Sequence, residues 1–81
     1  MNKKLYTVIV GYGDRGQKYA DYALERPQEL GIAAVVDPKD FKLQEAKKRY
    51  GLEDNCLFHS FSEFVKSGIA CDYVVNATMD Q

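Results

Sequence analysis

The sequence predicts an α/β fold built on a parallel sheet of the doubly wound kind, truncated after its fourth strand. Short apolar runs rich in β-branched residues alternate with segments of helical periodicity, which is typical of strands joined by crossover helices. The runs are continuously apolar, as in strands covered on both faces. At 81 residues there is room for one small domain. Right-handed crossovers then predict the strand order 3-2-1-4.

The first half of the chain holds two strands and one helix. A strand is expected at residues 5–10, a helix from Asp14 to Arg26 that is ended by Pro27, and a second strand at residues 32–36. One face of this helix is expected to pack on the sheet, and it carries Gly16, Ala20, Ala23 and Leu24.

The second half repeats the alternation. The expected elements are a helix from Asp40, its cap, to Tyr50, stopped by Gly51; a weak strand at 56–59; a short helix capped by Ser60 or Ser62 and ended by Gly68; and a buried strand at 73–77. The outer edge of this last strand is expected to be unpaired and prone to association.

Charge and composition argue against several classes of protein. Eleven Lys and Arg residues against twelve Asp and Glu form no basic block, so we expect no nucleic-acid partner. The apolar stretch after Lys4 is too short for a signal peptide or a membrane span, which favours a cytoplasmic protein without membrane contact. Cys56 and Cys71 are far apart in sequence, and two reduced, partly buried thiols are expected rather than a disulfide.

A glycine-rich turn carries the candidate site. Residues 11–16 read Gly-Tyr-Gly-Asp-Arg-Gly, a G-x-G-x-x-G pattern between a buried strand and an amphipathic helix, and this context predicts a dinucleotide-binding turn. Gly11 allows a tight turn, Gly13 leaves room for a pyrophosphate, and Gly16 allows the helix to pack closely. The free N–H groups at the helix start favour an anion, to which Arg15 adds a formal charge. The alternative is that the glycines only shape a strand–helix turn.

Asp37 closes the second strand, 21 positions after Gly16, close to the spacing of about 20 expected for a ribose-binding carboxylate. Its charge favours NAD over NADP, because it would repel a 2′-phosphate, and Lys39 lies close enough to soften that preference. Asp37 could instead be a turn residue before proline.

Other conspicuous side chains receive simpler interpretations. His59 has no metal-ligand spacing and is expected at the surface or at a strand end. Tyr19, Tyr22, Tyr50 and the phenylalanines lie at spacings typical of a core, so packing is expected rather than base stacking. No metal site is expected.

Several stretches together resemble one known family. The chain is similar to the amino-terminal domain of the glucose–fructose oxidoreductase/inositol dehydrogenase (Gfo/Idh/MocA) family over almost all of its length. The likeness rests on residues 10–16, Tyr19-Ala20, Val35-Val36-Asp37-Pro38, Tyr50-Gly51, residues 61–64 and residues 71–78. The arginine-containing glycine loop followed by Asp-Pro is much more specific than the glycines alone.

The resemblance implies that residues 1–81 are the N-terminal part of an NAD(P)-binding Rossmann domain. It assigns Gly11, Tyr12, Gly13, Asp14, Arg15 and Gly16 to the pyrophosphate region, Asp37 to the adenine ribose, and Ala77 and Thr78 to the cofactor cleft. Family members often have proline after that threonine, where this chain has Met79.

The same resemblance implies that this chain alone is not catalytic. The family's catalytic lysine lies in a Glu-Lys-Pro motif beyond the fourth strand, and the substrate domain follows it. The implied parent protein moves a hydride on a sugar- or cyclitol-like substrate, and its partners would be the cofactor, its own C-terminal domain and further copies of itself. Three alternatives stay open: an NAD-dependent glycosidase of the same family, a non-catalytic dinucleotide-binding regulator, and an S-adenosylmethionine methyltransferase.

Overall fold

Four parallel strands form a single sheet in the computed structural model, which describes residues 4–76. The strand order is β3-β2-β1-β4, as predicted, and each neighbouring pair is parallel. The strands are β1 (Leu5–Val10), β2 (Leu30–Val36), β3 (Leu57–Phe58) and β4 (Tyr73–Asn76). Strand β2 begins two residues earlier than predicted, because Leu30 pairs with Leu5 of β1.

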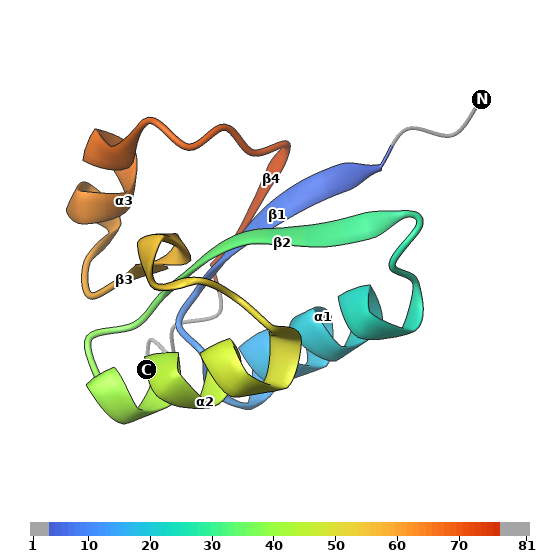
Figure 1. Cartoon of the computed structure of the whole chain (residues 1–81), viewed down its shortest axis with the longest axis horizontal. Helices are drawn as coiled ribbons and strands as arrows, with labels where there is room; N and C mark the ends of the chain where they lie inside the picture. The colour runs from blue at the N-terminus through green and yellow to red at the C-terminus, as the bar shows by residue number, and fades with distance from the viewer. Residues whose placement is uncertain (1–3, 77–81) are drawn as a thin grey trace.

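Helices cover both faces of the sheet (Figure 1). The helices α1 (Asp14–Glu25) and α2 (Asp40–Tyr50) lie side by side on one face, and α3 (Phe61–Ser67) lies on the other. A short 3₁₀ helix, η1 (Asp54–Cys56), leads from α2 into β3. The crossovers therefore alternate with strands along the whole described chain, as the sequence predicts.

The helix ends mostly follow the predicted signals. Helix α1 ends at Glu25, one residue before the predicted end, because the residue preceding Pro27 leaves helical geometry. The Ser60 side chain caps α3 by accepting a hydrogen bond from the Glu63 N–H at 3.2 Å. The expectation that Asp40 caps α2 is wrong: Lys39 is the cap residue, and Asp40 lies in the first turn, where the helix dipole favours its charge.

The core lies in two layers, one on each face of the sheet. Alternate strand residues point to opposite faces, so neighbouring residues of β1 enter different layers. The layer under α1 and α2 contains Ile9, Tyr12, Ala20, Val35, Leu43 and Ala46, and the layer under α3 contains Val8, Ala34, Val36 and Phe64. Burial on both faces accounts for the continuously apolar sequences of β1 and β2.

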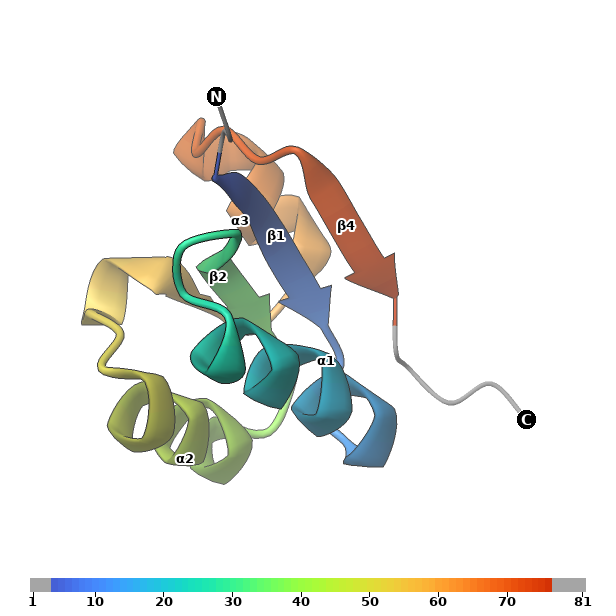
Figure 2. The ribbon, with the colours of Figure 1, turned by 90° about the vertical axis from the view of Figure 1, so that its right-hand side faces the viewer.

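Strand β4 departs from the prediction of a buried strand. It occupies an edge of the sheet (Figure 2), and Tyr73 and Val74 are about half exposed. Its apolar residues line an open hollow of about 280 Å³ between α1 and β4, together with Tyr19 and Tyr22 of α1. The prediction that Tyr19 and Tyr22 pack in the core is therefore wrong for the described chain.

The buried face of α1 is narrower than predicted. Gly16, Ala20 and Ala23 are buried, whereas Leu24 is 49% exposed, so its assignment to the packed face is wrong. Small residues on this face bring the helix close to the sheet. A β-carbon added at Gly16 would lie 2.3 Å from the Gly11 carbonyl oxygen and 3.1 Å from the Ile9 side chain. Close packing at Gly16 is thus a steric requirement of the β1–α1 turn.

Gly16→Ala should lower the free energy of unfolding by about 1–3 kcal/mol, because the added methyl group meets backbone that has little freedom to move. Urea denaturation followed by circular dichroism measures the change. Gly13→Ala is the matched control, since a β-carbon there has no atom within 4 Å and should change stability by less than about 1 kcal/mol. Equal losses in the two variants would contradict the close-packing account.

Candidate dinucleotide-binding site

The glycine loop lies at the carboxyl end of β1, between that strand and α1. Gly11 has a φ angle of 90°, a left-handed conformation that favours glycine, and its N–H donates to the Val36 carbonyl at 2.7 Å. Gly13 is the N-cap residue of α1, and no side chain caps the helix. The loop therefore turns out of the sheet immediately beside the end of β2.

Asp37 is the polar side chain that meets this loop. Its Oδ2 accepts a hydrogen bond from the Tyr12 N–H at 2.8 Å, and its Oδ1 accepts one from the Lys39 N–H at 2.9 Å. The residue is only 7% exposed, and no ion pair to it occurs among residues 4–76. Two backbone donors thus hold a nearly buried carboxylate against the glycine loop.

Space remains open at the centre of the loop. A β-carbon at Gly13 would have no heavy atom within 4 Å, whereas one at Gly16 would overlap the backbone. The two glycines therefore have different roles: Gly16 is needed for packing, and Gly13 leaves an opening beside the start of α1. The N–H groups of the first helical turn lack carbonyl partners within the helix, so such an opening favours an anion.

The structure describes only some of the remaining predicted site residues. Asp14 and Arg15 belong to the first turn of α1, but their side chains lie outside the described part of the structure. Ala77 and Thr78 also lie outside the described residues. The Tyr12 side chain is fully buried in the layer under α2, so this residue faces the loop only with its backbone.

A polar network that the sequence analysis missed connects Tyr12 to both helices of this face. The Tyr12 hydroxyl donates to the Tyr50 hydroxyl at 2.8 Å, and the Tyr50 hydroxyl donates to Oδ1 of Asp21 at 2.9 Å. Arg49 Nε donates to the same Asp21 oxygen at 2.9 Å. The rings of Tyr12 and Tyr50 pack edge to face with centroids 5.9 Å apart. No sequence spacing links these four residues, because three separate elements bring them together.

The network shifts the proton affinities of its members. The hydrogen bond from Arg49, and then that from Tyr50, lower the pKa of Asp21 below its usual value. Burial raises the pKa of the Tyr50 hydroxyl, and its hydrogen bonds to Tyr12 and Asp21 raise it further. Burial also raises the pKa of Tyr12. Both phenols therefore remain protonated donors at neutral pH, while Asp21 remains a charged acceptor.

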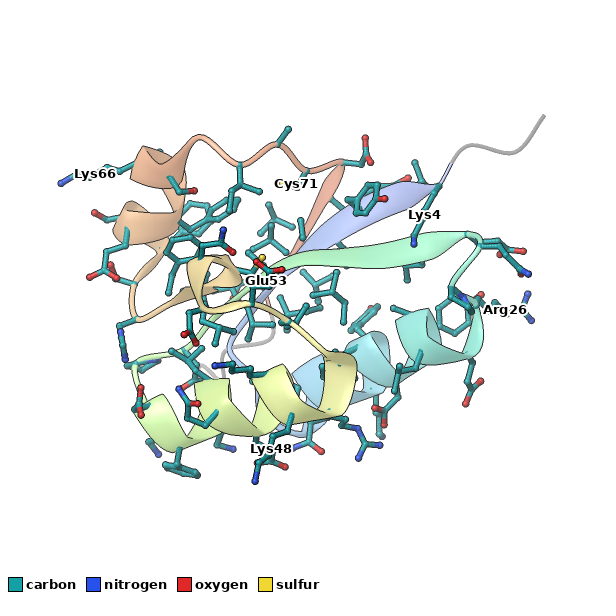
Figure 3. All side chains as sticks on the ribbon, in the orientation of Figure 1. Lys4, Arg26, Lys48, Glu53, Lys66 and Cys71 are labelled. Carbon is teal, nitrogen blue, oxygen red and sulfur yellow. The ribbon has the colours of Figure 1, made fainter. Side chains whose placement is uncertain are left out.

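The side chains given simpler interpretations are placed as follows. His59 is exposed just after β3, and its Nε2 lies 3.3 Å from Asp40 Oδ1. Cys56 and Cys71 are free and partly buried, as predicted, and Cys71 lies on the segment before β4 (Figure 3). Tyr50 and Phe64 pack in the core as expected, but Phe41 and Phe61 are 63% and 44% exposed.

The described residues contain neither a metal-binding cluster nor a membrane-spanning helix. Residues 4–76 contain no cluster of three or more metal-ligating side chains. Among the same residues, no helix has the length and apolar character needed to cross a membrane.

Comparison with known proteins identifies the family. Residues 5–81 match the model of the oxidoreductase family with an NAD-binding Rossmann fold, the Gfo/Idh/MocA family. The chain belongs to this family. Because the family is described as NAD-binding, the match favours a dinucleotide over S-adenosylmethionine as the cofactor. No curated protein shows significant similarity to the chain.

Solved structures show the same fold. The WlbA dehydrogenase from Bordetella pertussis, in complex with NADH and UDP-GlcNAcA, superposes with a TM-score of 0.79 at 21% identity, covering 94% of this chain and 22% of that one. An oxidoreductase from Agrobacterium radiobacter, in complex with NAD⁺, L-tartaric acid and magnesium, gives a TM-score of 0.74 at 23% identity, covering 95% and 21%. This NAD-binding domain thus spans about a fifth of the length of these two proteins.

Stability should depend on pH through Asp21. Because its pKa is lower in the folded state, ionised Asp21 stabilises the fold above its unfolded pKa of about 3.9, and this contribution is lost as the pH falls through the folded value. Asp21→Asn keeps an acceptor for Tyr50 but loses the charge. Wild type should therefore be more stable than this variant at pH 7, with the difference shrinking below about pH 4.

Urea midpoints measured between pH 2.5 and 7 test this expectation. Glu53→Gln is the control, because Glu53, labelled in Figure 3, is exposed. No hydrogen bond or ion pair of its carboxylate occurs among residues 4–76. A difference between wild type and Asp21→Asn that is the same across this pH range would contradict the assigned role of the Asp21 charge.

Proposed function

We propose that the chain binds NAD(H) with the diphosphate over Gly13 and the start of α1 and with the adenine ribose at Asp37. The carboxylate held against the glycine loop carries this proposal, because it places a ribose acceptor beside an opening suited to an anion. Family membership supports the same cofactor.

The hydrogen bonds of Asp37 leave it able to recognise a sugar. Each carboxylate oxygen accepts one backbone N–H, and an ionised carboxylate offers about four lone-pair sites in all. The remaining sites can accept hydrogen bonds from the two ribose hydroxyls. The same charge, unpaired with any cation in the described chain, would repel a 2′-phosphate and so favours NAD over NADP. Lys39 is the nearby residue that would soften this preference.

We assign the diphosphate mainly to backbone N–H groups at the start of α1. The Gly13 opening and the uncapped first turn of α1 supply N–H donors and the positive end of the helix dipole. Asp14 and Arg15 lie in this turn by sequence, and we assign Arg15 an additional charge contact with the phosphates. Ala77 and Thr78 are assigned to the wall of the cofactor cleft, where the chain continues from β4.

The complete protein is proposed to be an oxidoreductase that acts on a hydroxyl or carbonyl group of a sugar- or cyclitol-like substrate. When bound, the cofactor supplies or accepts the hydride. The residues of this chain bind and orient the cofactor, and no described residue is assigned a proton-transfer role. The WlbA structure, which holds NADH and UDP-GlcNAcA, supports this class of substrate by likeness of fold.

Asp37→Ala should weaken NADH binding by at least about tenfold, equivalent to about 1.4 kcal/mol, because the ribose loses its acceptor. Calorimetric titration of the 81-residue chain measures the dissociation constant, and circular dichroism checks the fold. Asp72→Ala is the matched control, since Asp72 also accepts a backbone N–H, that of Tyr6 at 2.8 Å, but outside the glycine loop. Unchanged affinity in Asp37→Ala, or no binding by wild type, would refute the proposal.

Gly13→Ala separates binding from stability. The added methyl group enters the space assigned to the diphosphate, so NADH should bind at least about tenfold more weakly while the urea midpoint stays close to that of wild type. Fluorescence titration of NADH and urea denaturation of the same preparation give the two quantities. If this variant binds NADH as tightly as wild type does, the assignment of the diphosphate to the space at Gly13 is wrong.

A further inference from the structure

We propose that Tyr12 is a positioning residue for the dinucleotide, which sets the glycine loop and the Asp37 carboxylate in place without touching the ligand. The inference rests on the proposed function and deepens it. It assigns a role to the residue between the first two glycines of the motif, whose side chain points into the core.

Tyr12 is held at both ends. Its backbone N–H donates to Asp37 Oδ2 at 2.8 Å, and its hydroxyl donates to Tyr50 at 2.8 Å. Its side chain is fully buried, so contact with a ligand in the loop is excluded. Because the two hydrogen bonds belong to one buried residue, a shift of Tyr12 that includes its backbone also displaces the N–H group that holds the carboxylate.

The hydroxyl end is anchored by charged groups on two helices. Tyr50 passes the hydrogen-bond chain to Asp21 of α1, and Arg49 of α2 donates to the same Asp21 oxygen. A buried hydroxyl without a partner is unfavourable, which restricts the Tyr12 ring to positions that keep this chain intact. The separation between α1 and α2 and the position of the ribose acceptor are thereby linked through a single residue.

The link predicts an effect on selectivity as well as on affinity. Rejection of a 2′-phosphate depends on a fixed carboxylate, because a carboxylate that can rotate away no longer opposes the extra charge. Loss of the Tyr12 hydroxyl should consequently weaken NADH binding more than NADPH binding. A role in stability alone would instead leave the ratio of the two affinities unchanged.

Tyr12→Phe keeps the ring and removes the hydroxyl, and Tyr50→Phe removes the next group in the chain. Each should raise the dissociation constant for NADH about fivefold, the scale of one lost hydrogen bond, and reduce the preference for NADH over NADPH. The double variant should bind NADH no more weakly than the weaker-binding of the two single variants, because both substitutions break the same chain of hydrogen bonds. Tyr19→Phe is the control, since Tyr19 is 49% exposed on α1 and outside the network.

Amide hydrogen exchange provides a readout without any ligand. Exchange at the backbone N–H of residue 12 should be faster in Tyr12→Phe and Tyr50→Phe than in wild type, and unchanged in Tyr19→Phe. Fluorescence titrations with NADH and NADPH, made well below the unfolding temperature, complete the test.

Wild-type exchange at residue 12 in both variants, or equal weakening of NADH and NADPH, would overturn the positioning role. If Asp37→Ala weakens NADH binding and Tyr12→Phe does not, the proposed function stands and only this inference fails. If wild type binds no NADH, both fail.

Discussion

A single, nearly buried carboxylate connects the glycine loop after β1 with the segment that leads from β2 into α2. Asp37 accepts the N–H of Tyr12, 25 positions earlier in the chain, and the N–H of Lys39, just before α2. A nearly buried charge is tolerated only when it is well hydrogen-bonded, so these two donors are a condition of the fold. The parallel pairing of β1 with β2 satisfies this condition, because Val10 pairs with Val36 and the two strands end together.

The glycine loop meets two opposing steric demands. At Gly16 the backbone of α1 approaches the end of β1 too closely for any side chain, while at Gly13 nothing occupies the space where a side chain would be. Close packing at the first position orients the helix, and the opening at the second exposes its N-terminal amides. Packing at Gly16 therefore determines the geometry of the turn, and the space left open at Gly13 is where we propose that the diphosphate binds.

The order of the elements, the strand order and the place of Asp37 at the end of β2 could be predicted, because each depends on local periodicity or on a short motif with fixed spacing. The hydrogen bond from the loop to Asp37 could not, because no spacing predicts it. The exposure of side chains at the edge of the sheet could not be predicted. The sequence of β4 is as apolar as that of a central strand, but Tyr73 and Val74 are exposed because β4 lies at the edge. Leu24 and Tyr22 likewise have helical spacing but face regions that no described element covers.

The direction of the Tyr12 side chain was equally beyond sequence reasoning. The middle position of a G-x-G motif carries no pattern that distinguishes a ligand contact from a core residue. Its hydroxyl partner, Tyr50, lies 38 residues later in the chain, on α2, and Tyr50 in turn donates to Asp21 on α1. Only the packing of the two helices brings these residues together. Helix ends marked by proline or glycine were predicted to within one residue, and Ser60, one of two predicted candidates, caps α3. The cap of α2 was predicted one residue too late, at Asp40 instead of Lys39.

A nuclear magnetic resonance titration of the ¹⁵N-labelled chain with NAD⁺ tests the central claim most directly. Binding across the glycine loop and the end of β2 should shift the amide resonances of Gly13, Gly16 and Gln17 together with those of Asp37 and Lys39. Amides of α3 and of the far end of β2 should remain unchanged. Shifts confined to those distant elements, or no shifts at saturating cofactor, would contradict the account.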